Sequence, residues 1–375
     1  MNFTIITHTI HKPYKGKIYA FAPYVREMNL WLKYADECVV VSPKDLSPPL
    51  PDQIPYDKEV KISHAPKFSL ISWKERFYTL FNLPLITWKV FRAMQQADHI
   101  HLRLPCNIGL IATFVQILFP NKPKTVKYAG NWDPEAPGPW SFRLQRKIVA
   151  NTFLSRNMKV LIYGKWPGQN HNLVPFFTAS YHENEIYEVS ARKLVEPLRL
   201  IYVGALSEGK QPLIAIQTAE ELLKRGHKVI LDIFGDGPLR PQLENYLHNK
   251  PSLKQSVILH GKTSSENLKK AYINSMFLIF ASKSEGWPKV VAESMVWKIL
   301  PITTPVSAVP YMLGYGERGS LIEPDSVKAA DEIEYYLKNP DIYRDKVNKA
   351  HQWSKQYTLE KFEREIKKIL DSFEK

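Results

Sequence analysis

The stretch ASKSEGWPKVVAESMVWKILPITT, from Ala281 to Thr304, contains two glutamates eight positions apart, Glu285 and Glu293. An apolar run with strand character, Phe277–Ala281, comes directly before them, and the residues that follow have the spacing of a helix. The two acids therefore lie on either side of a strand-to-helix junction. Two interpretations are open. The acids are paired ligands for a polar molecule, or they are surface acids near a helix N-terminus, where negative charge is favourable.

The junction has the residues of a turn that leads into a helix. Gly286 permits close backbone approach, and Pro288 suits the first helical turn, so we expect a helix that runs through Lys298. Free N–H groups and the positive dipole end would then face an anion. The side chain of Glu293 would lean back toward this end, and Glu285 would face the group beyond it. Two such carboxylates accept hydrogen bonds from vicinal hydroxyls.

Hydrophobic segments of strand character alternate with helix-period segments, which is typical of parallel sheets covered on both faces. A chain of 375 residues is also too long for one ordinary domain. We therefore expect an α/β protein with two doubly wound domains and ligands at the carboxyl ends of strands. The expected strands are Phe3–Thr9, Glu37–Ser42, His99–Leu104, Thr125–Tyr128, Lys159–Tyr163, Leu198–Val203, Val229–Phe234, Ser256–Leu259, Phe277–Ala281 and Leu300–Thr303. The expected helices include Pro212–Arg225, Leu239–His248 and Ser264–Ile273.

The expected boundaries follow from an irregular stretch, Asn170–Pro197, which mixes His, Asn, Glu and Pro. Residues after it resume the strand and helix alternation. The domains are placed at 1–175 and 198–357, with a linker at 176–197 and a helix at 358–375. This last helix is rich in Lys and Glu and is expected to pack back on the first domain.

The composition, 44% hydrophobic and 23% charged, is that of a soluble globular protein. No secretory leader is expected, because Met1–Ile10 has the pattern of a buried strand. No apolar run reaches the roughly 18 residues of a membrane span, and the longest, Asn107–Phe119, is expected to form a packed helix. Cys38 and Cys106 are the only cysteines, which excludes a cysteine zinc site and argues against disulfides. We expect a cytoplasmic protein.

The formal net charge of +14 favours anionic partners such as nucleotide phosphates, nucleic acid or an acidic membrane surface. Counted along the sequence, residues 101–150 hold seven Lys or Arg against two Asp or Glu. The segment Ile71–Met94 interleaves aromatic and basic residues. It is interpreted either as a peripheral contact with an anionic bilayer at the inner face of the plasma membrane, or as an ordinary helix pair that covers a sheet.

Two further segments have the order strand, glycine turn, helix. LRLIYVGALSEGKQPLIAI contains Gly204 after its strand and Lys210 near its helix start, where the dipole disfavours a cation unless an anion is bound. A solvated surface lysine is the plain alternative. VILDIFGDGPLRPQLENYL has a Gly-Asp-Gly-Pro turn, which alone is common.

Together, VGxL…K, FGDGPxRxxLE, LHG, SEGWPKVVAES and PVS resemble the C-terminal domain of retaining GT-B fold glycosyltransferases. The glutamate pair is similar to the E-x7-E motif of glycosyltransferase family 4, the group 1 type. The resemblance covers residues 198–325. It implies GT-B architecture, with two Rossmann-like domains that face a central cleft. One position departs from the pattern: Ala205 stands where the family has arginine, so Lys210, Arg240 or another base would carry that charge.

The resemblance also implies roles in donor binding. Glu285 would contact hydroxyls of the donor sugar, Glu293 the nucleotide ribose, and Lys210 the diphosphate as it leaves. Gly204 would let its loop approach the phosphates. The backbone of Gly286, Trp287, Pro288, Lys289 and Val290 would hold the sugar and the diphosphate, and Gly261, Lys262 and Thr263 would lie near the base.

In the first half, ADHIHLRLPCNIG resembles the family's segment with a histidine near the transferred sugar. Arg103 aligns with that histidine, while His101 lies two positions earlier on the expected strand. One of the two is expected to face the cleft as a catalytic group. A plain core histidine is the alternative for His101.

Acceptor-binding candidates come from two loops of the first half. KYAGNWDPEAPGPW follows an expected strand, so its polar and aromatic residues would lie where strand ends meet ligands. The basic turn in HKPYKGKIY could approach a phosphate or an anionic acceptor, or be a plain exposed turn. The candidates are Lys15, Gly16, Asn131, Trp132 and Asp133.

The resemblance implies transfer of a sugar from a UDP-, GDP- or ADP-sugar to a glycan or lipid-linked acceptor, as in bacterial surface polysaccharide synthesis. No cofactor is expected, and no metal, because the sequence has no D-x-D pair. The alternatives are a degenerate nucleotide-sugar-binding scaffold, supported by Ala205, a sugar-nucleotide epimerase, and a nucleic-acid binder. No recognisable nucleic-acid module is present, and a dehydrogenase is disfavoured because no G-x-G-x-x-G follows either first strand.

Overall fold

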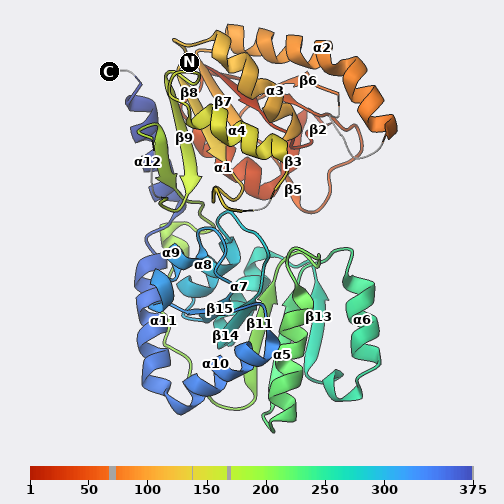
Figure 1. The fold of residues 1–375 in the computed structure, drawn as a ribbon, viewed down its shortest axis with the longest axis vertical. Helices are drawn as coiled ribbons and strands as arrows, with labels where there is room; N and C mark the ends of the chain where they lie inside the picture. Colours follow the sequence, from red (N-terminus) through yellow and green to blue (C-terminus); the bar gives the residue numbers. More distant parts are fainter. Residues whose placement is uncertain (67–72, 137, 167–169, 374–375) are drawn as a thin grey trace. The chain divides into compact units, whose positions relative to one another are not determined.

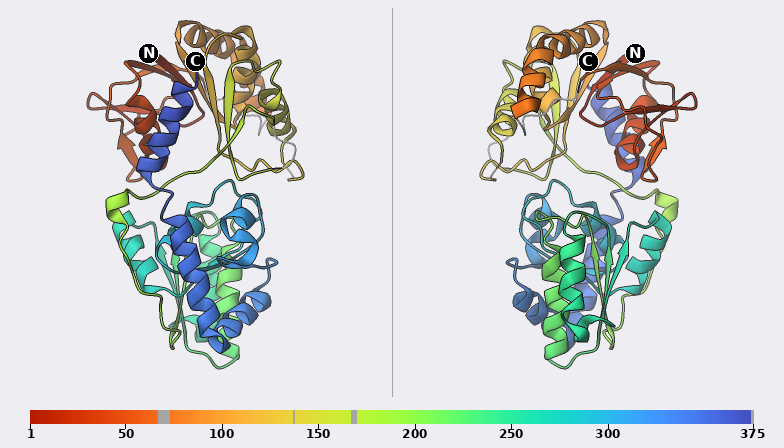
Figure 2. Two further views of the ribbon diagram at one scale, coloured as in Figure 1. Left: turned by 90° about the vertical axis from the view of Figure 1, so that its left-hand side faces the viewer. Right: turned by 90° about the vertical axis from the view of Figure 1, so that its right-hand side faces the viewer.

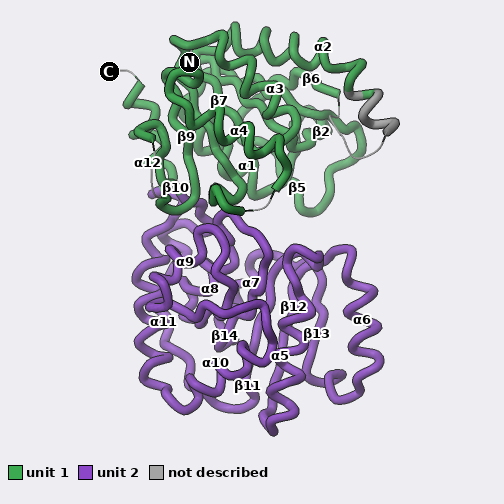
Figure 3. The backbone as a smooth tube through the Cα atoms, in the orientation of Figure 1, with its two compact units in different colours: residues 1–176, 362–375 green, residues 177–361 purple. Residues whose placement is uncertain are grey.

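The computed structural model describes residues 1–66, 73–136, 138–166 and 170–373. The chain forms two compact units (Figure 3). Unit 1 consists of Met1–Phe176 with Phe362–Lys375, and unit 2 consists of Phe177–Lys361. Each unit is organised around its own parallel sheet (Figure 1).

Unit 1 contains a seven-stranded sheet with the order β10-β9-β8-β7-β1-β4-β6. All of its strand pairs are parallel, as the alternating pattern predicts. Its central strands are buried on both faces. The strands β1 and β9 are mainly apolar, whereas β8 (KTVKY) also buries Lys124 and Lys127. The strands are β1 (Asn2–Ile6), β4 (Glu37–Ser42), β6 (Lys61–His64), β7 (His99–Leu104), β8 (Lys124–Tyr128), β9 (Met158–Tyr163) and β10 (Leu173–Phe176).

Helices cover both faces of this sheet: α2, α3 and α4 lie on one face, and α1 and α12 on the other (Figure 2). The core between the sheet and α2 and α3 is aliphatic. A polar Thr4 hydroxyl in this layer is satisfied by the carbonyl of Ala93 at 3.2 Å. The helices are α1 (Ala22–Leu32), α2 (Trp73–Gln96), α3 (Asn107–Val115), continued by a 3₁₀ turn (Gln116–Leu118), α4 (Trp140–Ala150) and α12 (Leu359–Asp371).

The C-terminal segment packs into unit 1. The ring of Phe362 meets Phe176 edge to face at 5.1 Å between centroids, and Phe373 meets His99 at 5.5 Å. Glu363 accepts a hydrogen bond from Lys33 at 2.5 Å. Aromatic burial and one ion pair therefore join the end of the chain to the first sheet.

A small antiparallel sheet, β2 (Lys12–Tyr14), β3 (Lys17–Phe21) and β5 (Gln53–Pro55), is attached to unit 1. Lys15 and Gly16 form the turn between β2 and β3, with φ of 47° and 76°. Two consecutive positive φ angles are typical of a tight hairpin turn, where glycine is at no disadvantage. The sequence did not predict this hairpin.

Unit 2 contains a six-stranded parallel sheet with the order β13-β12-β11-β14-β15-β16. Helix α5 packs with α10, and α8 packs with α11. The strands are β11 (Leu198–Val203), β12 (Val229–Phe234), β13 (Val257–Gly261), β14 (Phe277–Phe280), β15 (Leu300–Thr303) and β16 (Ser320–Leu321). The helices are α5 (Pro212–Lys224), α6 (Arg240–His248), α7 (Ser265–Asn274), α8 (Lys289–Val296), α9 (Val309–Met312), α10 (Ser326–Lys338) and α11 (Pro340–Ser354).

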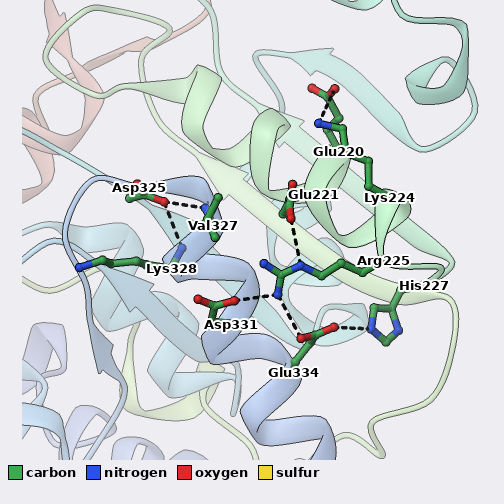
Figure 4. Close-up of polar contacts among 10 residues, drawn as sticks. All are labelled: Glu220, Glu221, Lys224, Arg225, His227, Asp325, Val327, Lys328, Asp331 and Glu334. Carbon is green, nitrogen blue, oxygen red and sulfur yellow. Dashed lines mark hydrogen bonds and ion pairs between the residues drawn. The ribbon is translucent and has the colours of Figure 1, made fainter.

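An ion-pair network joins α5 to α10 on one side of unit 2 (Figure 4). Arg225, at the end of α5, contacts Asp331 at 2.7 Å and Glu334 at 3.0 Å, both on α10. It also pairs with Glu221 of its own helix at 3.0 Å. The second oxygen of Glu334 lies 3.2 Å from His227. One guanidinium thus bridges two helices, a geometry that the planar donors of arginine permit.

Two helix predictions were wrong. Helix α8 was expected to run through Lys298, but it ends at Val296, and Lys298 has a left-handed φ of 55°. The N–H of Ile299 returns to the carbonyl of Ser294 at 3.0 Å, which closes the helix before β15 begins.

The segment Ile71–Met94 was considered as a helix pair. From Trp73 it forms one helix, α2, with Pro84 inside it, while Ile71 and Ser72 lie outside the described residues. Pro84 leaves the carbonyl of Leu80 without its helical donor. Because Leu80 is 67% exposed, water can hydrate that carbonyl and the helix continues.

Candidate functional site

Three loops of unit 2 meet at the carboxyl edge of its sheet, where a doubly wound fold binds ligands. The N–H of Gly204, after β11, donates to the carbonyl of Phe234 at 3.0 Å. The N–H of Gly235, after β12, donates to the carbonyl of Gly261 at 2.9 Å. The ends of β11, β12 and β13 are therefore fixed to one another by backbone hydrogen bonds.

Gly235 is required by this close approach. Its φ is +130°, and a Cβ atom there would lie 1.9 Å from the carbonyl oxygen of Gly204. Gly237 is restricted in a similar way, since its Cβ would lie 2.5 Å from the carbonyl oxygen of Leu206. The Gly-Asp-Gly turn thus has a packing role next to the Gly204 loop.

The loop that carries Lys210 is shaped by Tyr202, a residue that the sequence reasoning missed. The hydroxyl of Tyr202 donates toward the carbonyls of Ala205 at 3.1 Å and Lys210 at 3.2 Å. Burial and then the charge of Glu285 raise the pKa of this phenol. From the loop after β14, Lys283 N–H donates to the carbonyl of Gly209 at 2.9 Å. The Lys210 loop is therefore fixed by hydrogen bonds from Tyr202, on β11, and from Lys283, in the loop after β14.

Lys210 and Glu285 form an ion pair in which the ammonium group donates to the carboxylate. The side chain of Lys210 is 29% exposed and that of Glu285 is 9% exposed. The Lys210 nitrogen also lies 5.7 Å from the centroid of the Phe280 ring. The structure thus brings together a cation and an acid that the sequence singled out separately. A cation that remains partly exposed here can contact an anionic ligand.

The turn after Glu285 leads directly into α8, whose N-terminus no side chain caps. Trp287 is 6% exposed and points into unit 2. Its ring stacks on Trp353 at 5.9 Å and meets Tyr357 at 5.3 Å. The aromatic residue of the Gly-Trp-Pro turn therefore anchors the turn, while the backbone around Pro288 stays near the uncapped helix end.

Glu293, five residues into α8, is fixed by two hydroxyls. Ser180 donates to one carboxylate oxygen at 2.5 Å, and Tyr272, on α7, donates to the other at 3.1 Å. Tyr272 is fully buried, and burial followed by the charge of Glu293 raises its pKa. Each carboxylate oxygen has two lone pairs, so both can still accept a hydrogen bond from a ligand hydroxyl. No sequence pattern pointed to Ser180 or Tyr272 as partners of Glu293.

The position of the missing arginine, Ala205, is exposed. The guanidinium of Arg240 pairs with Glu244 at 2.8 Å and lies 3.3 Å from the Cβ position of Gly261. Of these two basic candidates, Lys210 is the one that pairs with Glu285. The loop of Gly261, Lys262 and Thr263 follows β13, and its Gly261 has a φ of +74°.

In unit 1, the structure places His101 in the core. It is fully buried, its Nδ1 lies 2.9 Å from the Thr125 hydroxyl, and its ring packs on Trp31 at 4.7 Å. Burial, and next the charge of Arg103, lower its pKa well below the usual value. These contacts match the plain core alternative for His101.

Arg103 forms a buried ion pair with Glu27 of α1 at 2.7 Å. Burial lowers the pKa of Arg103, but the charge and hydrogen bond of Glu27, together with Tyr163 and Tyr24, outweigh burial, and the net pKa is raised. The guanidinium also lies 5.4 Å from the ring of Tyr24. Nearby, desolvation and then the Arg103 charge lower the pKa of His8, an exposed residue just after β1 that the sequence reasoning missed.

The acceptor candidates lie in two separate loops of unit 1. Lys15 and Gly16 form the exposed hairpin turn, and the Lys15 nitrogen lies 5.4 Å from the ring of Tyr14. Trp132 is 6% exposed and packs edge to face on Tyr128 at 4.9 Å.

The two polar neighbours of Trp132 stabilise the loop locally. Asn131 accepts from the N–H of Asp133 at 2.9 Å, and Asp133 accepts from the N–H of Glu135 at 2.9 Å. These are Asx-type turn contacts, which need no ligand.

Two kinds of feature are absent from the described part of the chain. No cluster of three or more His, Cys, Asp or Glu residues there has a geometry for a metal ion. No helix there is both long enough and apolar enough to cross a membrane.

The second unit matches a known family. Residues 184–357 match the family described as "Glycosyl transferases group 1". The matched range begins after the first residues of unit 2 and includes Lys210, Glu285 and Glu293, together with their loops.

Two relatives also align with part of the chain. An alpha-D-kanosaminyltransferase from Streptomyces kanamyceticus is 27% identical over 144 residues, which cover 38% of this chain and 37% of the relative. A Campylobacter jejuni alpha-1,4-N-acetyl-D-galactosaminyltransferase, named for a diNAcBac-PP-undecaprenol-linked acceptor, is 26% identical over 176 residues, or 46% and 47% of the two chains. The alignments thus span less than half of each relative.

Solved structures match over almost the whole chain. Anabaena HepE in complex with UDP and glucose superposes with a TM-score of 0.70 at 14% identity, covering 99% of this chain and 100% of the other. Sucrose-phosphate synthase from Thermosynechococcus elongatus has a TM-score of 0.68 at 17% identity, with coverage of 99% and 98%.

These matches define the chain as a protein of the GT-B fold, with two Rossmann-like units, as the sequence predicted. Its residues 184–357, which include Lys210, Glu285 and Glu293, match the glycosyl transferases group 1 family.

Proposed function

We propose that the chain is a retaining, metal-independent glycosyltransferase that transfers a sugar from a UDP-, GDP- or ADP-sugar to a glycan or lipid-linked acceptor. One observation carries the proposal: Lys210 and Glu285 are paired at the carboxyl edge of the second sheet, directly before the uncapped N-terminus of α8. A cation and a free helix end suit a diphosphate, and an adjacent carboxylate suits sugar hydroxyls.

In this proposal each residue of unit 2 has a defined contact. Glu285 accepts hydrogen bonds from hydroxyls of the donor sugar, and Glu293 accepts them from the ribose. Lys210 and the backbone from Gly286 to Val290 bind the diphosphate, and the Gly261–Thr263 loop lies beside the base. The support is the geometry of the pair and of Glu293, whose carboxylate is already oriented by Ser180 and Tyr272.

The proposed reaction breaks the bond between the anomeric carbon and the diphosphate oxygen, through an oxocarbenium-like transition state. The acceptor hydroxyl oxygen forms the new bond on the same face, and its proton passes to the leaving phosphate. Negative charge gathers on the diphosphate during this step. Lys210 and the α8 N-terminus stabilise that charge, which is the main contribution of this chain to the rate.

Unit 1 is proposed to bind the acceptor, with Lys15, Gly16, Asn131, Trp132 and Asp133 as candidates and Arg103 and His101 as candidate catalytic groups. The burial of His101 and the Arg103–Glu27 pair make both more suited to positioning than to contact. The proposed setting is bacterial surface polysaccharide synthesis in the cytoplasm, with peripheral contact at the inner face of the plasma membrane. The C. jejuni relative, named for a lipid-linked acceptor, supports this choice.

A nucleotide-sugar-binding scaffold without turnover is the second candidate, favoured by the exposed Ala205 in place of arginine. The test is a turnover assay with UDP-, GDP- and ADP-sugars, in which free nucleoside diphosphate is measured with and without extracted glycan and lipid-linked acceptors. Release that rises with acceptor supports the transferase. Binding without release supports the scaffold, and conversion of the donor sugar without nucleotide release supports an epimerase.

A further inference from the structure

One side of α2 is apolar although it does not face the sheet. We call this the α2 outer face: Tyr78, Phe81, Leu85, Trp88 and Arg92. These residues recur every three or four positions and therefore form one stripe along the helix. The first four side chains are 56%, 82%, 44% and 59% exposed.

The opposite side of the same helix supplies the core of unit 1. Ile86, Val90 and Met94 are fully buried against the sheet. An ordinary surface helix has one apolar stripe and one polar side. Helix α2 has two apolar stripes, and only one of them is buried in the core of unit 1.

The charges along the α2 outer face are basic. The guanidinium of Arg92 lies 5.8 Å from the ring of Trp88. The sequence holds no acidic residue between Glu75 and Asp98. Lys89, on the flank of the stripe, donates to the carbonyl of His64 at 2.5 Å. Aromatic and aliphatic groups with cations and no acid between them are complementary to an anionic lipid surface.

The neighbouring α3 segment of the same layer also has exposed apolar side chains. Phe91 of α2 meets Phe119 at 5.3 Å between ring centroids, which joins α2 to the end of this segment. Phe114 on the segment is 49% exposed and Leu118 is 66% exposed. Exposed apolar groups therefore occur on both helices.

We propose that the α2 outer face docks unit 1 onto an anionic phospholipid bilayer. Phe81 and Leu85 enter the boundary of the acyl chains, while Tyr78 and Trp88 lie at the level of the headgroups, where such rings are favoured. Arg92 contacts lipid phosphates. This assigns a surface to the membrane contact proposed above, but it does not depend on sugar transfer.

A bilayer fits this face better than a second copy of the chain does. In a symmetric dimer the face would pack against itself, and its basic groups would find no acidic partner there, because no Asp or Glu lies between Glu75 and Asp98. A bilayer supplies anionic phosphates and accommodates a narrow convex stripe.

The experiment is co-sedimentation of the full chain with vesicles of phosphatidylcholine alone and of phosphatidylcholine with phosphatidylglycerol. The test variant is Phe81→Glu with Trp88→Glu. The control, Ile258→Glu with Tyr335→Glu, makes the same charge change at side chains of unit 2 that are 44% and 46% exposed. Circular dichroism and thermal unfolding show whether each variant is folded, independently of vesicle binding and of sugar transfer.

We expect the wild type and the control to bind vesicles that contain phosphatidylglycerol, less strongly at high salt, and to leave phosphatidylcholine vesicles unbound. The test variant should bind at least tenfold less. Equal binding by the test variant, or no binding by the wild type, would overturn the proposal. A wild-type dimer in light scattering that the test variant dissociates would also overturn it, in favour of an interface between copies.

Discussion

The ammonium group of Lys210 donates a hydrogen bond to the carboxylate of Glu285, across 75 positions of sequence. The two side chains come from the loops after β11 and β14, which are neighbouring strands of the second sheet. In a parallel sheet the loops after neighbouring strands meet at one edge. In the proposed function, the positive group of this pair contacts the charged end of a diphosphate sugar and the negative group contacts its hydroxylated end.

Lys210→Met is expected to lower turnover of the donor by about 10²–10³-fold, the loss typical when one transition-state charge contact is removed. Lys210→Arg keeps the charge and should lose less. Nucleotide release under saturating donor measures this effect. A Lys210→Met enzyme within twofold of the wild type would show that the leaving diphosphate is stabilised elsewhere.

Tyr272→Phe removes only the hydroxyl that orients Glu293. We expect it to weaken nucleotide binding by about 1 kcal/mol, or several-fold in the KM of the donor, with kcat almost unchanged. Ser180→Ala should act in the same direction. Tyr335→Phe, at a half-exposed tyrosine of α10, is the matched control. A loss of thermal stability with an unchanged KM would assign Tyr272 a purely structural role.

Gly235→Ala should unfold unit 2 or destabilise it by more than about 3 kcal/mol, because the new Cβ overlaps the Gly204 carbonyl and the backbone has positive φ. Gly209→Ala is the control: nothing lies within 4 Å of its Cβ position, and its φ is not positive. Urea unfolding of both variants checks this. Equal free energies of unfolding for the two variants would mean that the loops after β11 and β12 can move apart at little energetic cost.

Unit 1 should lose stability as the pH falls from 6.5 toward 5. Burial lowers the pKa of His11 to about 4 and that of His99 to about 3, and His101 is lowered further. Below pH 6.5 the unfolded chain binds protons that the folded unit cannot, so the folded state loses on the order of 1 kcal/mol per histidine and pH unit. Carboxylates whose pKa is lowered in the folded state affect the stability only below this pH range.

Urea unfolding at pH 7, 6 and 5 measures this dependence. His101→Met should reduce the slope of the unfolding free energy against pH by the contribution of about one proton, whatever its effect on the unfolding free energy at pH 7. A slope that is the same in wild type and His101→Met would show that His101 is protonated in the folded state or that water reaches it.

Much of the fold could be predicted because most buried parallel strands are rich in apolar and β-branched residues. The predicted bounds of β4, β7, β11, β12 and β15 agree with the structure. Errors arose where tertiary context decides. Helix α8 ends early because Lys298 takes a left-handed φ before β15, and the hairpin at Lys15 and Gly16 has strands of only three and five residues.

The sequence indicates candidate site residues one by one, but not how they are arranged. Local spacing indicates Lys210 and Glu285 separately. Their pairing depends on the order of the strands in the sheet, which the hydrophobic periodicity of the sequence does not indicate. Ser180 is 113 positions from Glu293, and a single serine in an irregular segment carries no local signal. Tyr272 has the spacing of a core residue on α7, and only the structure shows where its hydroxyl points.

The central claim is that unit 2 binds a nucleoside diphosphate sugar through Glu293 and its neighbours. Calorimetry with a panel of UDP-, GDP- and ADP-sugars, on the wild type and Glu293→Ala, tests it most directly. We predict micromolar binding of one donor by the wild type and loss of that binding in the folded variant. Failure of the folded wild type to bind any donor, or equal binding by Glu293→Ala, would contradict the account.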